Sequence, residues 1–161
     1  MGNQHTLKID LSWLACAIEG EGCITIYVAK NNNGGRRYIP QINWANTNID
    51  FIDALTKILK RIDVAHHTTL RQAKNLRCKP AYHTSCAGQK SVAKLLRTVK
   101  PYLRSKIGQL QLTLRFIESR VSRIKVTGYS HTPYNETELG YYRGIRKLNQ
   151  KGVRDCTLDA K

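Results

Sequence analysis

The feature that most constrains this fold is an apolar segment near the N-terminus that ends abruptly in acids and glycines. Residues 11–18 are apolar at nearly every position, and Glu-Gly-Glu-Gly follows at residues 19–22. A helix that is apolar almost all round belongs in a protein interior, and Gly20 and Gly22 are suited to end it. We therefore expect a buried helix that begins at Asp10, the N-cap residue.

The composition of this segment also points to contacts outside the chain. The small residues Ala15, Cys16, Ala17 and Gly20 would let a second helix approach closely. Glu21 would stand just past the helix C-terminus, where its charge faces the negative end of the helix dipole. That placement is favourable if the Glu21 carboxylate and free backbone carbonyls together hold a cation.

The rest of the chain alternates hairpin and helix patterns. β-Branched residues predict strands at 23–29 and 36–46 around an Asn/Gly turn at 31–35, and Pro40 predicts a bulge or an unpaired N–H position. Helical periodicity covers 49–61, strands follow at 64–70 and 81–87, and helices at 89–99 and 105–123 are separated by Pro101. We expect one α+β domain over residues 1–161, an antiparallel sheet backed by helices. Residues from about 124–161 form its C-terminal helical extension, with a helix at 137–149.

The charge distribution indicates a polyanionic partner. The chain has 27 Lys and Arg against 11 Asp and Glu, a net charge of +16, and between Asp63 and Glu136 the only acid is Glu118. Interspersed acids would accompany an ordinary solvated helix face, so their absence favours a nucleic-acid surface. No apolar run is long enough for a membrane span. Five irregularly spaced cysteines favour a reducing compartment, so we expect an intracellular protein in a prokaryote or an organelle, without membrane partners.

The motif at residues 14–22, Leu-Ala-Cys-Ala-Ile-Glu-Gly-Glu-Gly, resembles the LAGLIDADG motif of homing endonucleases. Residues 99–110 resemble the family's segment that carries a basic active-site residue, and residues 145–152 resemble its C-terminal region. The resemblance implies the family's α+β fold, with helices backing a saddle-shaped antiparallel sheet. Cys16 stands where the motif usually has Gly, and Glu21 where it has Asp.

The family's site roles transfer to individual residues. The resemblance implies that Glu21 binds a divalent metal, with the carbonyl of Gly20 beside it, and that Glu19 has a structural role at the helix end. Lys106 matches the basic residue that acts near the scissile phosphate, and Asn46 is the candidate that orders water, although an ungapped register would put Trp44 there. Mg²⁺ is the expected cofactor, and Mn²⁺ or Ca²⁺ can occupy such a site.

A single copy of the motif implies a homodimer, because cutting both DNA strands needs two sites. The motif helices of two chains would pack along a twofold axis. The residues expected at this interface are Trp13, Ala15, Cys16, Ile18, Glu19 and Gly20.

Double-stranded DNA is the expected partner, read by the hairpins because a two-stranded ribbon fits the major groove. The candidate contacts are Thr25, Tyr27, Asn31, Arg36, Arg37, Gln41, Asn43, Thr68, Arg71, Lys74, Arg77 and Tyr82. His66 and His67 lack a third metal ligand and would face opposite ways on a strand, so a metal site there is not expected. Trp13 and Trp44 are expected in the core rather than as base-stacking platforms.

The expected function is an intron-encoded homing endonuclease that makes a double-strand break in a long, pseudo-palindromic site by metal-dependent phosphodiester hydrolysis. Two alternatives on the same fold remain open. One is an RNA-binding intron maturase, and the other is a DNA-binding regulator that does not cleave. Neither would need Glu21 and Lys106.

Overall fold

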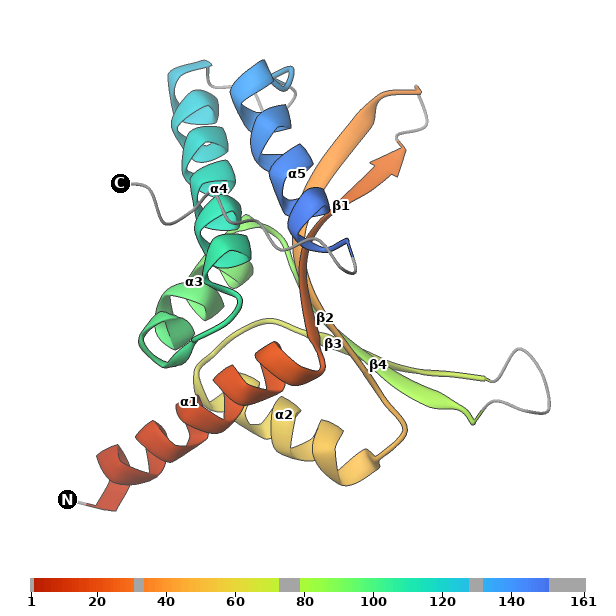
Figure 1. Cartoon of the computed structure of the whole chain (residues 1–161), viewed down its shortest axis with the longest axis vertical. Coiled ribbons are helices and arrows are strands. Elements are labelled where there is room, and N and C mark those ends of the chain that lie inside the picture. The colour runs from red at the N-terminus through yellow and green to blue at the C-terminus, as the bar shows by residue number, and fades with distance from the viewer. Residues whose placement is uncertain (1, 31–33, 73–78, 128–131, 151–161) are drawn as a thin grey trace.

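The computed structural model describes residues 2–30, 34–72, 79–127 and 132–150, with side chains from residue 4 onward (Figure 1). Helices and strands alternate in the order expected from the sequence, and all strand pairs are antiparallel. The elements are α1 (Gly2–Gly20), β1 (Gly22–Lys30), β2 (Arg36–Asn46), α2 (Ile49–Arg61), β3 (His67–Arg71), β4 (Ala81–Ala87), α3 (Gln89–Val99), the 3₁₀ turn η1 (Lys100–Tyr102), α4 (Ile107–Thr127) and α5 (Glu136–Leu148). The α+β class is confirmed.

The four strands form one sheet in the order β1-β2-β4-β3, so β2 and β4 join the two hairpins at its centre. β1 and β2 pair continuously from Gly22↔Trp44 to Lys30↔Arg36, without a bulge. The pairing of β2 with β4 begins only at Gln41↔Ala87. Pro40 therefore sits where β4 ends, and its carbonyl still accepts the Gly88 N–H at 3.0 Å. A proline at this point leaves no ladder N–H missing, because the pairing of β2 with β4 begins only at the next residue. The half of the β1–β2 hairpin beyond Pro40 extends past the rest of the sheet.

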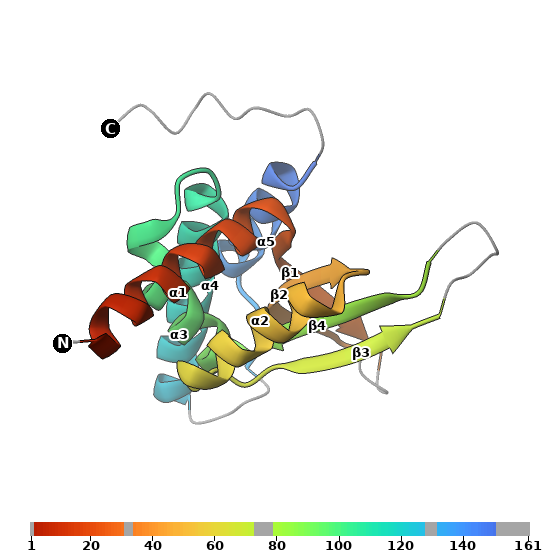
Figure 2. The same cartoon turned by 90° about the horizontal axis from the view of Figure 1, so that it is seen from below.

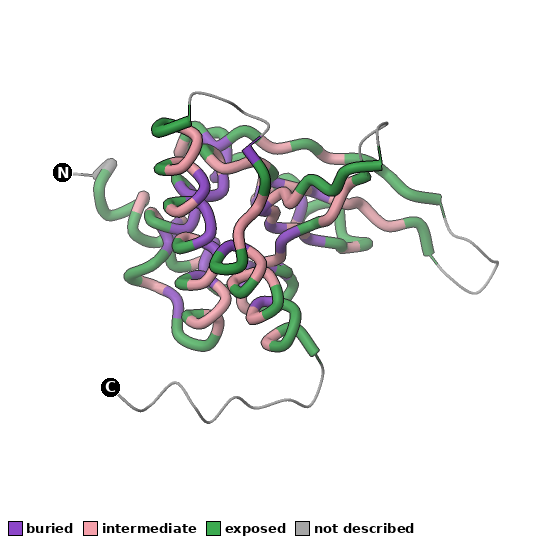
Figure 3. The backbone as a smooth tube through the Cα atoms, turned by 90° about the horizontal axis from the view of Figure 1, so that it is seen from above, coloured by how far each residue is buried: buried purple, intermediate pink, exposed green. Residues whose placement is uncertain are grey.

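All five helices lie on one side of the sheet, and the two hairpins reach away from them in different directions (Figures 1 and 2). Strand residues alternate between faces, and the set containing Ile24, Ile42 and Trp44 is buried under the helices. Figure 3 shows this buried layer between sheet and helices, with exposed backbone along both hairpins. Cys86 belongs to the same layer, and burial raises the pKa of its thiol to about 12.

Local signals explain most helix boundaries. α2 begins where the Asn48 side chain accepts a hydrogen bond from the Asp50 N–H at 2.8 Å, and its buried residues recur at helical spacing. α5 begins with a capping box in which Asn135 and Glu138 each accept the other's backbone N–H. α3 ends at Val99 and gives way to η1, which contains the helix-breaking Pro101.

The largest differences from the sequence prediction are at two helix boundaries. α1 begins at Gly2 rather than at Asp10, because Asp10 lies inside the helix and its carboxylate pairs with Arg61 at 2.6 Å. α4 continues to Thr127, past the expected end at residue 123. α1 is also not buried on every side, since Ile9 is 56% exposed. In the part of the chain that the structure describes, no helix is both long and apolar enough to cross a membrane.

Candidate functional site

The end of α1 is held against the sheet by a close approach that only glycine allows. A Cβ on Gly22 would lie 2.8 Å from the Ile18 carbonyl oxygen and 2.9 Å from Trp44 Nε1. The Trp44 indole N–H donates to the Ala17 carbonyl at 3.2 Å, which gives this oxygen a second donor besides the Glu21 N–H. Trp44 is 1% exposed and lies in the core as expected.

Glu19, the first motif acid, caps the segment before α4. Its Oε1 atom accepts hydrogen bonds from the consecutive backbone N–H groups of residues 104–106. Burial acts to raise the pKa of Glu19, but the hydrogen bonds from Ser105 and Arg104 outweigh it and leave the pKa lowered. Glu19 thus anchors the segment that carries Lys106 to the end of the motif helix.

Lys106, the expected basic residue, lies directly at the end of α1. Its Nζ donates to the Ile18 carbonyl at 2.9 Å and to the carbonyl of Gly22. Burial lowers the pKa of Lys106, whereas Cys23 and the carboxylates of Glu19 and Glu21 act in the opposite direction. The two hydrogen bonds place the ammonium between the end of α1 and the start of β1.

Glu21, the second motif acid, is exposed, and its backbone N–H still closes the last turn of α1 on the Ala17 carbonyl at 3.1 Å. Gly20 is exposed as well. Hard oxygen donors such as the Glu21 carboxylate and the Gly20 carbonyl suit Mg²⁺ or Ca²⁺. Among the described residues of one chain, no three His, Cys, Asp or Glu side chains converge on a possible metal site. Further ligands would therefore come from outside this set, such as DNA phosphate, water or a second chain.

The sheet face turned away from the helices is open and polar. Register and alternation place a mixed set of hydroxyl, amide, imidazole and guanidinium groups on it. These open-face residues are Cys23, Thr25, Tyr27, Arg37, Ile39, Gln41, Asn43, His67, Thr69, Arg71, His83 and Ser85. At its centre is a hollow of about 540 Å³ whose lining includes Gln41, Asn43 and His83. Burial and the Arg71 charge lower the pKa of His83, which favours a neutral ring able to donate and accept.

The structure sorts the expected DNA contacts into three groups. Thr25, Tyr27, Arg37, Gln41, Asn43 and Arg71 share the open face. Arg36, Thr68 and Tyr82 have the opposite parity and are therefore not on the open face; a contact of these three residues with DNA stays a prediction. Thr68 instead exchanges a hydroxyl hydrogen bond with the buried Thr84 at 3.0 Å. Asn31, Lys74 and Arg77 lie outside the described residues.

In β3 and β4, four open-face residues were not among the predicted DNA contacts: His67, Thr69, His83 and Ser85. β3 and β4 show no clear alternation of apolar and polar residues, so the sequence pattern did not reveal which parity faces the core. The available signal was Cys86, a residue type that is usually buried. Its parity would have assigned Thr84 to the core and His83 and Ser85 to the open face.

Asn46 does not join the residues at the end of α1. It shares the parity of Trp44 rather than that of Asn43, and its Oδ1 accepts a hydrogen bond from the Asn48 N–H at 2.9 Å. This Asx turn leads the chain from β2 into α2. The expected water-ordering role for Asn46 is therefore not supported by its position, and the geometry gives it a turn-forming role.

Some of the residues expected at the dimer interface are buried in the chain's own core, and others are exposed. Ala15 and Ile18 are fully buried within the chain's own core, so they offer no surface to a partner. Trp13 is partly buried against Phe51, with ring centroids 5.3 Å apart. The exposed line along α1 runs through Ile9, Ser12, Cys16 and Gly20, at steps of three or four residues that keep them on one helix face.

Comparison with known proteins reveals likeness of structure alone. No protein-family model matches the sequence, and no curated protein matches it. The fold is similar to that of the homing endonuclease I-CvuI in complex with its target, with a TM-score of 0.58 and 16% identity over 89% of this chain and 97% of that one. For the group I intron-encoded homing endonuclease I-CeuI, complexed with DNA, the TM-score is 0.60 and the identity is 14%, over 90% of this chain and 69% of that one. For the DNA-bound meganuclease I-SmaMI, the TM-score is 0.61 and the identity is 13%, over 89% of this chain and 45% of that one. The chain therefore has the homing-endonuclease fold that its motif led us to expect.

Proposed function

We propose that this protein is a homodimeric, metal-dependent homing endonuclease that cleaves both strands of a long, pseudo-palindromic DNA site. One observation carries the proposal: the Lys106 ammonium, from a segment far away in the sequence, donates to the carbonyl of Gly22, the residue next to Glu21, at the start of β1, where the polar open sheet face begins. A cleavage-competent pair thus adjoins a surface suited to DNA. The description of I-CeuI as encoded by a group I intron supports an intron origin for this chain as well.

The open face supplies the recognition surface. A two-stranded ribbon fits the major groove, where Arg pairs with guanine and Gln or Asn pairs with adenine. Arg37, Gln41 and Asn43 provide these groups from one strand, and Arg71 provides another from the second hairpin. The net charge of +16 would favour phosphate contacts over a long site, with binding that weakens steeply as salt rises.

The residues at the end of α1 fit a divalent metal. Glu21 and the carbonyl of Gly20 would hold it, and crystal structures of I-CvuI are described in the presence of Mg or Ca. When bound, such a metal lowers the pKa of water and stabilises charge on a leaving oxygen. Lys106 would stabilise negative charge developing on the phosphate. Glu19 would hold the backbone around Lys106 in place through its three N–H contacts.

The exposed line on α1 supports pairing of two chains. Gly20 has no atom within 4 Å of a Cβ placed on it, so this part of the helix has room for another backbone. Ser12 and Cys16 are small and exposed on the same face. Two copies of this line, related by a twofold axis, would bring both Glu21 carboxylates toward the axis.

Cleavage is tested with a randomised pool of long DNA duplexes and Mg²⁺. We expect the wild type to cut a selected sequence on both strands, and Glu21→Gln to bind that sequence without cutting it. Glu118→Gln is the matched control, because Glu118 is exposed on α4 and pairs with Arg97 at 2.9 Å on the helical side. Binding without cleavage by the wild type would leave a DNA-binding regulator. An RNA pool is tested in parallel, and selection of RNA in preference to DNA would favour the maturase.

The dimer is tested by light scattering. We expect a mass of about twice 18.3 kDa for the wild type. Gly20→Leu should give single chains, because its side chain fits one chain but blocks a neighbouring helix. Gly140→Leu, an equally open position on α5, should remain dimeric. A wild type that stays monomeric with and without DNA would refute the homodimer.

A further inference from the structure

In the described part of the chain, no strand pairs with the outer edge of β2 at residues 36–39, and one tyrosine takes the place of such a strand. The pairing of β2 with β4 begins at Gln41, so residues 36–39 of β2 have no β4 partner. There the Tyr134 hydroxyl accepts the Tyr38 N–H at 3.1 Å and lies 3.5 Å from the Tyr38 carbonyl, to which it donates. An N–H and a C=O of one residue on the same edge are the two groups that an antiparallel neighbour would use. A single hydroxyl therefore docks this hairpin edge.

Aromatic rings strengthen the same contact. The Tyr38 ring packs edge-to-face against Tyr134 and Tyr142, with centroid distances of 4.7 and 4.9 Å. At the base of the hairpin, the Asn149 amide donates to the Ile24 carbonyl at 2.9 Å. The segment that includes α5 is thus joined to both the distal half and the base of the hairpin, along which it lies in Figure 1.

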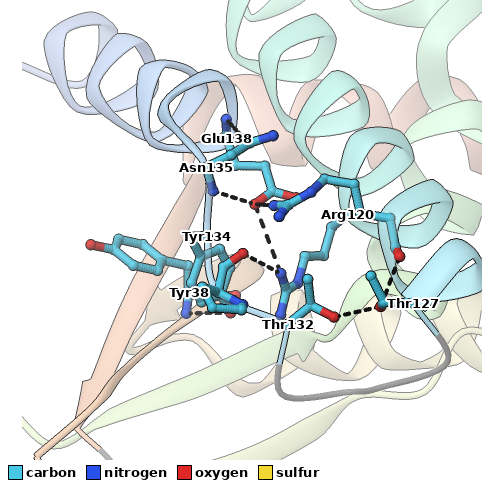
Figure 4. Close-up of polar contacts among 9 residues, drawn as sticks. Tyr38, Arg120, Thr127, Thr132, Tyr134, Asn135 and Glu138 are labelled. Atoms are coloured by element: carbon cyan, nitrogen blue, oxygen red, sulfur yellow. Dashed lines mark hydrogen bonds and ion pairs between the residues drawn. The ribbon is translucent and has the colours of Figure 1, made fainter.

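A buried charged group holds Tyr134 in place (Figure 4). The Arg120 guanidinium lies 4.2 Å from the centre of the Tyr134 ring and 3.8 Å from Glu138 Oε2. That oxygen also accepts from Arg123 at 2.7 Å and from the Asn135 N–H at 3.0 Å. Glu138 is 0% exposed and Arg120 is 3% exposed. The chain of contacts runs from Glu138 through Arg120 and Tyr134 to the backbone of β2.

Stability alone does not account for this arrangement. Burying ionised groups has a large desolvation cost, and apolar residues of similar volume often stabilise a protein equally well or better. The charged group fixes the orientation of the side chains around it, because Glu138 contacts two arginines and also forms the N-terminal cap of α5. The residues flanking Tyr38 on the strand, Arg37 and Ile39, face the open side. Their orientation therefore depends on how Tyr38 is docked.

We infer that Glu138, Arg120 and Tyr134 form a positioning cluster that sets the orientation of the distal β1–β2 hairpin and thereby the specificity of the DNA positions read through Arg37. The inference rests on the proposed DNA-binding function. It predicts that disturbing the cluster changes recognition at those positions selectively, rather than weakening binding to all sequences equally.

The docking step is tested without DNA by amide hydrogen exchange. Tyr134→Phe removes only the hydroxyl and leaves the ring under Arg120. The Tyr38 amide should then exchange about fivefold faster, the effect expected for the loss of one hydrogen bond. Tyr142→Phe is the matched control: its ring also packs on Tyr38, but its hydroxyl contacts Arg146 instead of β2. An unchanged Tyr38 exchange rate in Tyr134→Phe would overturn the inference.

The recognition step is tested by selection from a randomised duplex pool. Arg37→Ala and Arg71→Ala first identify the target positions that each hairpin reads. Tyr134→Phe should lose about threefold to tenfold in base preference at the Arg37 positions, the equivalent of a partly lost base contact. The Arg71 positions should keep their preference, and Tyr142→Phe should match the wild type throughout.

The outcomes separate the inference from the proposed function. A wild type that selects no DNA sequence refutes the proposed function, and hydrogen exchange still decides whether the cluster docks the hairpin. A wild type that selects DNA, with a Tyr134→Phe profile that is unchanged or uniformly weakened, refutes the inference. Glu138→Gln should give the same selective loss with a lower Tm, and Tyr134→Phe decides the question if Glu138→Gln does not fold.

Discussion

Adding one methyl group at Gly22 should disrupt the junction between the motif helix and the sheet. The new Cβ would lie 2.8 Å from both the Cα and the carbonyl oxygen of Ile18 and 2.9 Å from Trp44 Nε1. Two of these three atoms belong to the backbone and cannot rotate away. Relief therefore requires α1 or β1 to shift, and the indole with it.

The expected cost can be assembled from these contacts. Overpacking of a tight site costs about 1–3 kcal/mol, and a displaced indole loses its hydrogen bond to Ala17, about 0.5–1.5 kcal/mol. The lower entropy of the unfolded alanine variant returns about 0.4–1 kcal/mol. We expect Gly22→Ala to lower the free energy of unfolding by about 2–3 kcal/mol, and the Tm by about 5–10 °C for a domain of this size.

Urea unfolding followed by tryptophan fluorescence, together with calorimetry, measures both quantities. Gly140→Ala is the control, because Gly140 lies within α5 and a Cβ there meets nothing within 4 Å. Alanine should stabilise that helix by about 0.5–1 kcal/mol, so the same chemical change should have opposite signs at the two positions. A Gly22→Ala variant within about 0.5 kcal/mol of the wild type, the usual range for a surface change, would refute the close approach.

Four further predictions follow from the site. Lys106→Met should slow cleavage about 100-fold while DNA affinity falls much less, and equal losses in the two assays would make Lys106 a phosphate anchor. Because the pKa of Glu19 is lowered in the folded protein, its contribution to stability is present above its ordinary pKa near 4.5 and is lost as the pH falls below it. Urea titrations of Glu19→Gln should lack that acid-dependent loss, and a curve parallel to the wild type would contradict the assignment. Thr69→Ala should alter base preference in pool selection more than Thr68→Val does, because only Thr69 is on the open face, and the reverse order would contradict the register. Mild oxidation should cross-link two chains through Cys16, the cysteine on the exposed line of α1, as judged by non-reducing gels of wild type and Cys16→Ser; a dimer that persists in Cys16→Ser would disprove this linkage.

Local patterns predicted most of the fold. The β-branched strand 23–29 and the helix at 49–61 appear almost as expected, because each has a strong period and clear stop signals. The start of α1 was missed because the Asp10 cap signal competes with a tertiary contact. Arg61 pairs with Asp10 from α2 and stabilises it inside the helix. The sequence predicted no parity for β3 and β4, because those strands have no apolar alternation.

In the candidate site, too, local features were predicted from the sequence and tertiary contacts were not. The motif identified Glu19, Glu21 and the segment around Lys106, because these residue types and their spacing are local properties of the chain. The turn that Asn46 forms was not predicted, because its hydrogen-bond partner, the Asn48 N–H, lies in the connection to α2 and outside the strand pattern. No sequence pattern predicted the contact between Tyr134 and Tyr38, since the two residues are 96 positions apart.

The sequence by itself therefore determined the element order, the α+β class, the acids and glycines at the end of α1 and the basic character of the chain, all of which depend on neighbouring residues or on composition. Only the tertiary structure decided which strand residues face outward and which side of α1 is available to a partner. It also decided that buried charges from α4 and α5 dock the distal hairpin. Those outcomes depend on packing between segments far apart in the chain, where the burial of one surface fixes the orientation of another.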